Sequence, residues 1–366
     1  MKIERAIISG GGTGGHIFPA VAIADEIKRR NPDVKILFVG AEGKMEMEKV
    51  PAAGYEIKGL QIVGFQRKLS LSNFLLPFKI IKSLMKARSI VKEFKPQIAI
   101  GVGGYASGPT LKAATMLKIP SVIQEQNSFP GKTNKILSKS VAKICVAYDG
   151  LDRFFPKEKI VFTGNPTRKD MIETQGKEAE GYNFYEFDPN KKTILIIGGS
   201  LGARTLNESV VNKLDELKSA EVQVLWQCGK LYNKKLKEEL KNTNLGNVKM
   251  VQFIHRMDLA YAIADVVISR AGAISVSELC LVQKPTILVP SPNVAEDHQT
   301  KNAMALVKND AAILVKDVEA KETLIPRALE LLKDEFESQK LITQISTMGK
   351  SNATYDIVNV LESIIS

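Results

Sequence analysis

The sequence predicts an α/β protein made of two doubly wound, Rossmann-like domains that face each other across a cleft. Three observations support this fold class. The chain of 366 residues is long enough for two domains with buried cores. Short β-branched runs alternate with helical stretches along it, which indicates βαβ units with right-handed crossovers. A glycine-rich loop follows the first expected strand of each half.

Twelve short apolar runs are the expected strands, six in each half. A polar stretch over 164–192 separates the two sets, so we expect an N-terminal domain over 1–164 and a C-terminal domain over 165–350. Residues 351–366 have helical periodicity and are expected to pack back on the first domain. The strands are expected at 6–8, 34–39, 97–101, 121–124, 143–147 and 160–163, and at 193–197, 222–226, 248–253, 265–269, 285–289 and 311–315.

Composition excludes several classes of protein. With 44% hydrophobic and 25% charged residues, the chain is neither disordered nor fibrous. No apolar run approaches the roughly 18 residues of a spanning helix, and the amino terminus lacks the apolar core of a signal peptide, so we expect a soluble cytoplasmic protein. The cysteines, Cys145, Cys228 and Cys280, are far apart and form no CxxC pair. This argues against a disulfide scaffold or a zinc site.

The formal charge of +11 is unevenly distributed. Residues 1–164 hold 26 Lys and Arg against 13 Asp and Glu, which is +13, and the remainder carries −2. The basic half contains a dense segment, 65–95, with eight cations and one acid among apolar residues. For the loop over 65–78, contact with an anionic membrane surface stands at least level with an ordinary crossover segment that has a solvated lysine face. For Ile81, Leu84 and Met85, packing of a crossover helix on its sheet is favoured, and no nucleic-acid-binding motif accompanies the charge.

Three glycine clusters follow expected strands, at 10–16, 101–109 and 198–203. The carboxyl ends of parallel strands share one sheet edge, where glycines admit a ligand and helix amino termini attract anions. We therefore expect the clusters to line one crevice. The first cluster also fits GxGxxG, which would suit a dinucleotide oxidoreductase. The acidic residue expected to close the second strand of such a protein is poorly supplied, because that strand ends in Val39-Gly40-Ala41-Glu42. That alternative also leaves the third cluster unexplained.

Two further features carry candidate chemistry. The segment 269–278 leads from a strand through glycine into a helix, where Glu278 could accept hydrogen bonds from a ribose diol; the alternative is a capping pair of Ser275 with Glu278. His16 is the only histidine inside a glycine cluster, which makes it a candidate general base or hydrogen-bonding group. Neither an Asp-x-Asp pair nor histidines at metal-ligand spacing are present, so we expect no metal.

Taken together, the motifs resemble one family of GT-B glycosyltransferases, the MurG family of UDP-N-acetylglucosamine-dependent N-acetylglucosaminyltransferases. The resemblance covers essentially the whole chain, and seven ordered motifs are far more specific than any one of them. They are GGTGGHIFPA (11–20), GVGGYASGP (101–109), QEQN (124–127), GNPTR (164–168), GGSLGA (198–203), RAGAISVSE (270–278) and HQTKNA (298–303). The chain departs from the family pattern at Leu201, usually Gln, and at Ala271, often Ser.

The resemblance implies roles for individual residues. Glu278 would bind the ribose and Ile254 the uracil of the donor, and a group of glycines with Tyr105 would bind the acceptor. The implied donor-binding residues, for UDP-N-acetylglucosamine, are Thr13, Gly14, Gly15, Asn127, Arg168, Ser200, Ile254, Ala273, Ile274, Ser275, Val276, Ser277, Glu278 and Gln299. The implied acceptor-binding residues are Gly103, Gly104 and Tyr105.

The resemblance and the motifs together predict an inverting transfer. The 4-hydroxyl of the muramyl sugar of lipid I would attack the donor sugar, giving lipid II for peptidoglycan synthesis, cell shape and division. His16 is the expected base and Glu125 the rival, with the leaving diphosphate stabilised by helix starts after Gly15 and Ser200 and by Arg168. No cofactor is expected. The expected partners are the two substrates and the anionic cytoplasmic face of the inner membrane, not nucleic acid.

Two alternatives keep the same loops. A UDP-sugar epimerase of this fold would act on UDP-N-acetylglucosamine without an acceptor. A non-catalytic subunit would bind the sugar nucleotide and turn nothing over.

Overall fold

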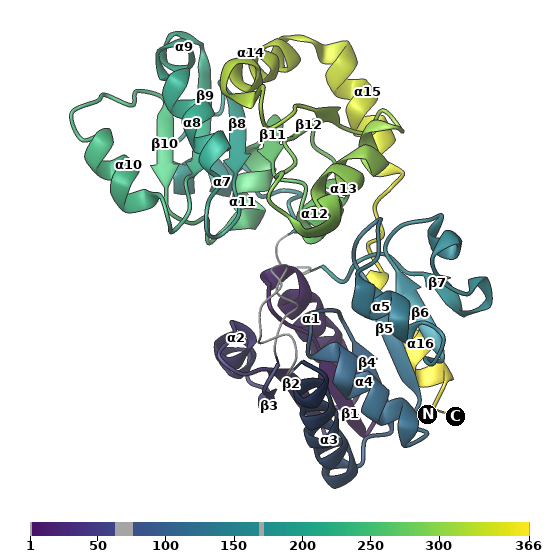
Figure 1. The fold of residues 1–366 in the computed structure, drawn as a ribbon. Coiled ribbons are helices and arrows are strands. Elements are labelled where there is room, and N and C mark those ends of the chain that lie inside the picture. Colours follow the sequence, from purple (N-terminus) through teal and green to yellow (C-terminus); the bar gives the residue numbers. More distant parts are fainter. Residues whose placement is uncertain (1, 63–75, 168–171, 366) are drawn as a thin grey trace. The chain divides into compact units, whose positions relative to one another are not determined.

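The computed structural model describes residues 2–62, 76–167 and 172–365, and the chain divides into two compact units (Figure 1). Unit 1 comprises Met1–Thr167 and Lys350–Ser366, and unit 2 comprises Arg168–Gly349. The division falls after Thr167, whereas the sequence placed it after Gly164. Side-chain hydrogen bonds explain the difference: Asn165 accepts from Gln124 Nε2 at 3.0 Å and donates to the carbonyl of Gln126 at 3.0 Å.

Unit 1 contains a seven-stranded, wholly parallel sheet in the order β3-β2-β1-β4-β5-β6-β7. The order reverses between β1 and β4, which creates the crevice at which doubly wound sheets bind ligands. Their bounds are β1 (Arg5–Ser9), β2 (Lys35–Ala41), β3 (Glu56–Leu60), β4 (Ile98–Gly101), β5 (Ser121–Glu125), β6 (Lys143–Val146) and β7 (Ile160–Phe162).

Helices cover both faces of this sheet. Buried Ile8 packs in a cluster with the apolar faces of α1 and α16, and Ile7 on the opposite face packs with α3 and α4. The helices are α1 (Gly14–Arg30), α2 (Glu46–Ala52), α3 (Leu76–Phe94), α4 (Ser107–Met116), α5 (Lys132–Leu137) and α16 (Ala353–Ser363), with short 3₁₀ turns η2 (Leu151–Arg153) and η3 (Lys157–Lys159).

The carboxyl-terminal helix α16 packs against α1, in the unit that the chain left at Thr167. Ile357, Val358 and Leu361 are fully buried there. Arg30 of α1 forms an ion pair with Glu362 at 2.8 Å. Apolar burial thus attaches this helix to unit 1, with an ion pair at its rim.

Unit 2 repeats the architecture with a six-stranded parallel sheet in the order β10-β9-β8-β11-β12-β13. The order reverses between β8 and β11, and fully buried Trp226 of β9 donates to Asn207 Oδ1 at 2.9 Å. The strands are β8 (Lys192–Ile197), β9 (Val222–Gln227), β10 (Val248–Val251), β11 (Val266–Ser269), β12 (Thr286–Leu288) and β13 (Ile313–Leu314). The predicted fold class, two doubly wound α/β domains, is confirmed.

The helices of unit 2 connect and cover these strands (Figure 1). None of the helices in the described part of the chain is long and apolar enough to cross a membrane. Their bounds are α7 (Glu178–Tyr185), α8 (Arg204–Asn212), α9 (Leu214–Ser219), α10 (Asn233–Glu239), α11 (Met257–Ile263), α12 (Ala273–Val282), α13 (His298–Val307), α14 (Ala320–Lys333) and α15 (Glu335–Ser346), with the 3₁₀ turn η4 (Ala295–Asp297).

Two expectations from the sequence were wrong. The first half has a seventh strand, β3, whose sequence EIKGL has no continuous apolar run. Among the described residues β3 is an edge strand that pairs only with β2. On α3, Ile81 is 55% exposed and Met85 is 68% exposed, whereas only Leu84 of the three packs against the core. The predicted packing of Ile81 and Met85 on the sheet is therefore wrong.

Candidate active site

In unit 1, the glycine loop after β1 lies directly against the loop after β4. Gly103 and Gly104 have φ angles of +95° and +83°, which favour glycine. A Cβ atom on Gly104 would lie 2.4 Å from the carbonyl oxygen of Gly11, and one on Gly103 would lie 2.8 Å from His16 Nε2. The structure therefore brings together the predicted base and two predicted acceptor residues, and side chains on those glycines would close the site.

His16 lies in the first turn of α1 and is partly buried. Its Nδ1 is 2.9 Å from the carbonyl oxygen of Gly11 and 3.3 Å from Thr13 Oγ1. Because a carbonyl oxygen can only accept, this contact places the proton of the neutral ring on Nδ1 and the lone pair on Nε2. That is the tautomer in which Nε2 can act as a base.

The amino terminus of α1 suits an anion or a sugar oxygen. The helix begins at Gly14, whereas the sequence placed its start after Gly15, and Thr13 is its N-cap with no side-chain cap hydrogen bond. Thr13 and Gly15 are exposed, and the first turn contains no acidic residue. The positive end of the helix dipole is therefore presented at the predicted donor residues Thr13, Gly14 and Gly15.

Glu125, the rival base, ends β5 and is 1% exposed. Its carboxylate accepts hydrogen bonds from the backbone and side-chain nitrogens of Asn127 at 3.0 and 3.1 Å, from Gly131 N at 3.1 Å and from Asn134 Nδ2 at 2.8 Å. Four donors on one carboxylate hold the loop that carries Asn127. This geometry suits ordering of the loop rather than proton transfer.

Tyr105, a predicted acceptor residue, is 59% exposed beside an apolar cavity of about 360 Å³. The cavity lies between α3, α4 and α5, and Lys79 and Lys112 contribute to its lining. Its other lining residues are Gln61, Ile62, Ile80, Ser83, Leu84, Gly108, Pro109, Thr133, Ile136 and Leu137.

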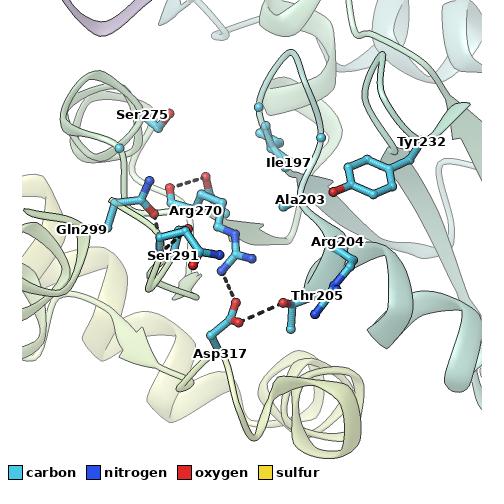
Figure 2. Close-up of a pocket in the computed structure, with 16 residues that line it drawn as sticks. Ile197, Ala203, Arg204, Thr205, Tyr232, Arg270, Ser275, Ser291, Gln299 and Asp317 are labelled. Carbon is cyan, nitrogen blue, oxygen red and sulfur yellow. Dashed lines mark hydrogen bonds and ion pairs between the residues drawn. The ribbon is translucent and has the colours of Figure 1, made fainter. Parts of the chain in front are cut away.

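Unit 2 has a polar cavity of about 530 Å³ between the glycine loop after β8 and the start of α12 (Figure 2). Of the predicted donor residues, Ser275 and Gln299 line it. Gln299 Oε1 accepts from the backbone nitrogen of Ser291 at 2.9 Å, which fixes its amide at the rim. The lining residues outside every segment that the sequence singled out are Ile197, Arg204, Thr205, Tyr232, Ser291, Asn293 and Asp317. The others are Gly198, Gly199, Gly202 and Ala203 of the predicted glycine cluster and Ser269, Arg270 and Gly272 of the predicted segment 269–278.

The glycine loop of unit 2 is held by the loop that follows β9. Gly202 and Gly229 pack backbone to backbone, since a Cβ atom on Gly229 would lie 2.1 Å from Gly202 N. Ser200 accepts a backbone hydrogen bond from Lys230 at 3.0 Å. The following helix, α8, begins only at Arg204, not directly after Ser200. The loop is thus fixed while Ser200 itself remains exposed.

Arg270 is the main cation that sequence reasoning missed in this cavity (Figure 2). Its Nη1 donates to Asp317 Oδ1 at 2.5 Å and to the carbonyl of Val289 at 2.9 Å, and Asp317 also accepts from Thr205 Oγ1 at 2.9 Å. Arg270 begins the RAGAISVSE motif and could have been selected on that ground. Asp317 follows β13 in a segment without a sequence signal.

The start of α12 settles one alternative. Gly272 is the N-cap and Ala273 the first helical residue, so Ser275 is already inside the helix and the alternative of a capping pair of Ser275 with Glu278 is excluded. Val276 is 1% exposed, and its backbone nitrogen donates to the carbonyl of Gly272 at 2.9 Å. Among the remaining predicted residues, Ala273, Ile274, Ser277 and Glu278 are partly exposed. Ser277 Oγ donates back to the carbonyl of Ala273 at 3.1 Å.

Ile254 is 2% exposed, and its backbone nitrogen donates to Gln227 Oε1 at 2.9 Å. Gln227 Nε2 donates in turn to the carbonyl of Gly199 at 2.9 Å. This buried glutamine, which the sequence analysis missed, connects the predicted uracil-binding loop with the glycine loop. Because the amide of Ile254 is occupied, a uracil contact would fall to its carbonyl oxygen.

The buried thiols do not enter this chemistry. All three cysteines are free and buried, and burial raises the pKa of Cys145 and of Cys280 to about 12. Burial, with a smaller contribution from the charge of Glu278, raises the pKa of Tyr261. Two predicted features lie outside the described residues. They are Arg168 and most of the loop over 65–78, of which only residues 76–78 are described.

Family models identify the class of protein that this fold and these sites define. The glycosyltransferase family 28 N-terminal domain matches residues 6–146, and the glycosyltransferase family 28 C-terminal domain matches residues 193–361. The chain belongs to glycosyltransferase family 28, which confirms the family resemblance seen in the sequence.

Individual relatives give a more specific match than the family models do. The chain is 56% identical over 364 residues to a UDP-N-acetylglucosamine–N-acetylmuramyl-(pentapeptide) pyrophosphoryl-undecaprenol N-acetylglucosamine transferase of Cytophaga hutchinsonii, covering 100% of this chain and 98% of the relative. It is 53% identical to the transferase of the same name from Flavobacterium psychrophilum, covering 100% and 99%. A crystal structure of Acinetobacter baumannii MurG matches with a TM-score of 0.78 at 28% identity, covering 98% and 99%.

Proposed function

We propose that this chain is an inverting glycosyltransferase that moves N-acetylglucosamine from UDP-N-acetylglucosamine to the 4-hydroxyl of lipid I, forming lipid II. The observation that carries this function is identity of 53–56%, over essentially the full length, to transferases of that name. Membership of glycosyltransferase family 28 agrees with it. The predicted function and enzyme class are thereby confirmed, and the epimerase alternative is not favoured.

The cavity of unit 2 supports the binding of the donor nucleotide. Its glycine loop offers backbone amides, and Arg270 supplies a cation held in place by Asp317. A diphosphate is the group that such a combination recognises. Glu278, one turn into α12, is proposed to accept from the ribose hydroxyls, and Ile254 and Gln227 to form the base-binding side.

Unit 1 is proposed to supply the base. His16 Nε2 takes the proton from the 4-hydroxyl of the muramyl sugar as its oxygen bonds to C1 of N-acetylglucosamine. The bond from C1 to the diphosphate oxygen breaks on the opposite face, which inverts C1 and releases UDP. Glu125 is proposed to order the loop of Asn127 through its four hydrogen bonds instead of acting as the base.

We propose a peripheral position at the anionic cytoplasmic face of the membrane, and the exposed side chains in the described part of α3 support the membrane contact. Phe78 is 72% exposed, and Ile80, Ile81 and Met85 are also exposed beside Lys79 and Lys82. The adjoining apolar cavity lies next to Tyr105, a predicted acceptor residue. Apolar side chains interspersed with lysines suit a reversible, salt-sensitive contact with anionic lipid, where a lipid-linked acceptor keeps its sugar.

An acceptor-omission experiment tests the function. UDP release from UDP-N-acetylglucosamine is measured with and without a short-chain lipid I analogue, and the sugar nucleotide is recovered afterwards. The proposal expects UDP release only with the acceptor. Conversion of the sugar nucleotide without the acceptor would indicate an epimerase, and binding without any turnover would indicate a non-catalytic subunit.

A further inference from the structure

Glu46 is a buried carboxylate at the glycine loop of unit 1. It is the first residue of α2 and is 1% exposed. A buried carboxylate is costly unless it is hydrogen-bonded. Here Oε2 accepts from the backbone nitrogen of Gly12 at 2.8 Å, and Oε1 accepts from that of Ala41 at 3.0 Å.

Two glycines make room for this side chain. A Cβ atom on Gly11 would lie 2.1 Å from Glu46 Oε1, and one on Gly40 would lie 2.6 Å from Glu46 Cγ. These distances are far below van der Waals contact. The position of the carboxylate therefore depends on glycines from the loop after β1 and from β2, so this is a built site rather than a chance contact.

A single peptide group connects Glu46 with His16. The nitrogen of Gly12 and the carbonyl of Gly11 belong to the same peptide bond. In a trans peptide these two groups point in opposite directions. The N–H donates to Glu46, and the carbonyl accepts from His16 Nδ1 at 2.9 Å. The carboxylate and the imidazole thus lie at the two ends of one hydrogen-bonded chain.

We propose that Glu46 is a positioning residue for His16, acting through the peptide between Gly11 and Gly12. By binding the N–H of that peptide, Glu46 fixes the direction of the carbonyl that holds the Nδ1 proton of the imidazole. The lone pair is then kept on Nε2. A carboxylate that accepts from a peptide N–H also polarises the carbonyl at its other end, which strengthens the second hydrogen bond. The catalytic use of this arrangement rests on the proposed function, whereas the tautomer is a property of the chain alone.

The matched variants are Glu46→Gln and Glu48→Gln. Glutamine has one acceptor oxygen where glutamate has two, so Glu46→Gln can satisfy only one of the two backbone amides. Glu48 lies on the same helix, is exposed and pairs with Lys49 at 3.0 Å. Its replacement removes the same charge from α2 without touching the hydrogen bond to Gly12.

Nitrogen-15 NMR of the imidazole rings tests the structural part without any turnover. The chain has three histidines, and a His16→Gln variant identifies the signals of His16. We expect neutral His16 to carry its proton on Nδ1 in the wild type and in Glu48→Gln, and to shift toward the Nε2-protonated form in Glu46→Gln. A wild-type His16 protonated on Nε2 overturns the proposal, even if Glu46→Gln does not fold. An unchanged tautomer in folded Glu46→Gln also overturns it.

Kinetics with the lipid I analogue test the functional part. Glu46→Gln should lower kcat about 10-fold, with the donor KM within about twofold of the wild type, because only the base is misplaced. Glu48→Gln should leave both constants unchanged. If kcat falls while the NMR tautomer is unaltered, Glu46 acts in some other way and the proposal fails. If the wild type itself transfers nothing to the analogue, the proposed function fails and the NMR result still decides the role of Glu46.

Discussion

The two glycine loops of the molecule occupy equivalent positions and have opposite surroundings. Each follows the first strand of its sheet, at the point where the strand order reverses. The loop of unit 1 has its Gly12 amide bound by the carboxylate of Glu46. The loop of unit 2 borders a cavity of about 530 Å³ that also contains Arg270.

This difference shows that a glycine loop alone does not define a phosphate site. An anion is disfavoured at the Gly12 amide, which a buried carboxylate already binds, although the start of α1 still suits a sugar oxygen. The cavity of unit 2 is lined by Arg270 together with its ion-pair partner Asp317. The first loop places a histidine, and the second is suited to a diphosphate. On this comparison we propose that the first loop serves the base and the second serves the nucleotide.

The largest effect should come from the histidine of the first loop. His16→Ala removes the proposed base, so kcat should fall by roughly 10² to 10⁴. Steady-state kinetics with the lipid I analogue measure this, and circular dichroism serves as the fold control. If kcat is unchanged, His16 is not the base, and the proton is removed by Glu125 or by water.

On the nucleotide side, Glu278→Gln should chiefly raise the donor KM. The variant loses a charge-assisted hydrogen bond to the ribose, worth about 1.5–3 kcal/mol, which corresponds to at least a 10-fold change. A donor with a 2′-deoxyribose provides the matched test, because the variant and the wild type should differ less with it. If the KM of Glu278→Gln for UDP-N-acetylglucosamine equals that of the wild type, Glu278 does not bind the ribose.

A smaller effect is expected where Gln227 joins the two parts of the nucleotide site. Gln227→Leu leaves Gly199 and Ile254 without their side-chain partner, and we expect a several-fold higher donor KM together with a lower melting temperature. Gln223→Leu is the control, since Gln223 lies on the same strand and binds Asp188 and Lys191 instead. It should lower the melting temperature without changing KM. Equal KM effects of both variants would count against the connection.

The membrane contact of unit 1 can be separated into two contributions by vesicle co-sedimentation. Lys79→Gln with Lys82→Gln should weaken binding to anionic vesicles at low salt by about 2 kcal/mol. Phe78→Ser with Ile81→Ser should weaken the part of binding that resists salt. Phe336→Ser, at an exposed aromatic of unit 2, is the control and should change nothing. If both double variants bind vesicles as the wild type does, α3 is an ordinary surface helix with no role in membrane binding.

The smallest effect should be that of chelation. Helix dipoles and Arg270 can stabilise the leaving diphosphate without a metal ion, so EDTA should reduce turnover less than about twofold. Initial rates with and without EDTA decide this. Complete loss that only magnesium or manganese restores would refute it.

The sequence predicted the fold well because buried parallel strands are marked by continuous β-branched runs. It failed at β3, an edge strand in which Glu56 and Lys58 interrupt the apolar residues. It failed also at Ile81 and Met85, since helical spacing does not show which apolar side chains meet the sheet.

Within the sites, the sequence located the glycine loops, His16, Ser275 and Gln299 but missed Glu46, Gln227 and Asp317. Glu46 lies in the charged stretch AEGKMEMEK, which is typical of solvated surface. Its burial depends on Gly11 and Gly40, which lie elsewhere in the chain. The sequence alone does not mark such buried residues, because the fold brings their partners from distant segments of the chain.

The most direct test of the comparison between the loops is calorimetric titration of UDP into the wild type, His16→Ala and Arg270→Met, each checked for folding. The account predicts wild-type affinity for His16→Ala and at least about 10-fold weaker binding for Arg270→Met, because an ionic hydrogen bond contributes about 1.5–3 kcal/mol. Uridine, which lacks the diphosphate, should bind both variants as it binds the wild type. Loss of UDP affinity in His16→Ala with wild-type affinity in Arg270→Met would contradict the assignment of the two loops.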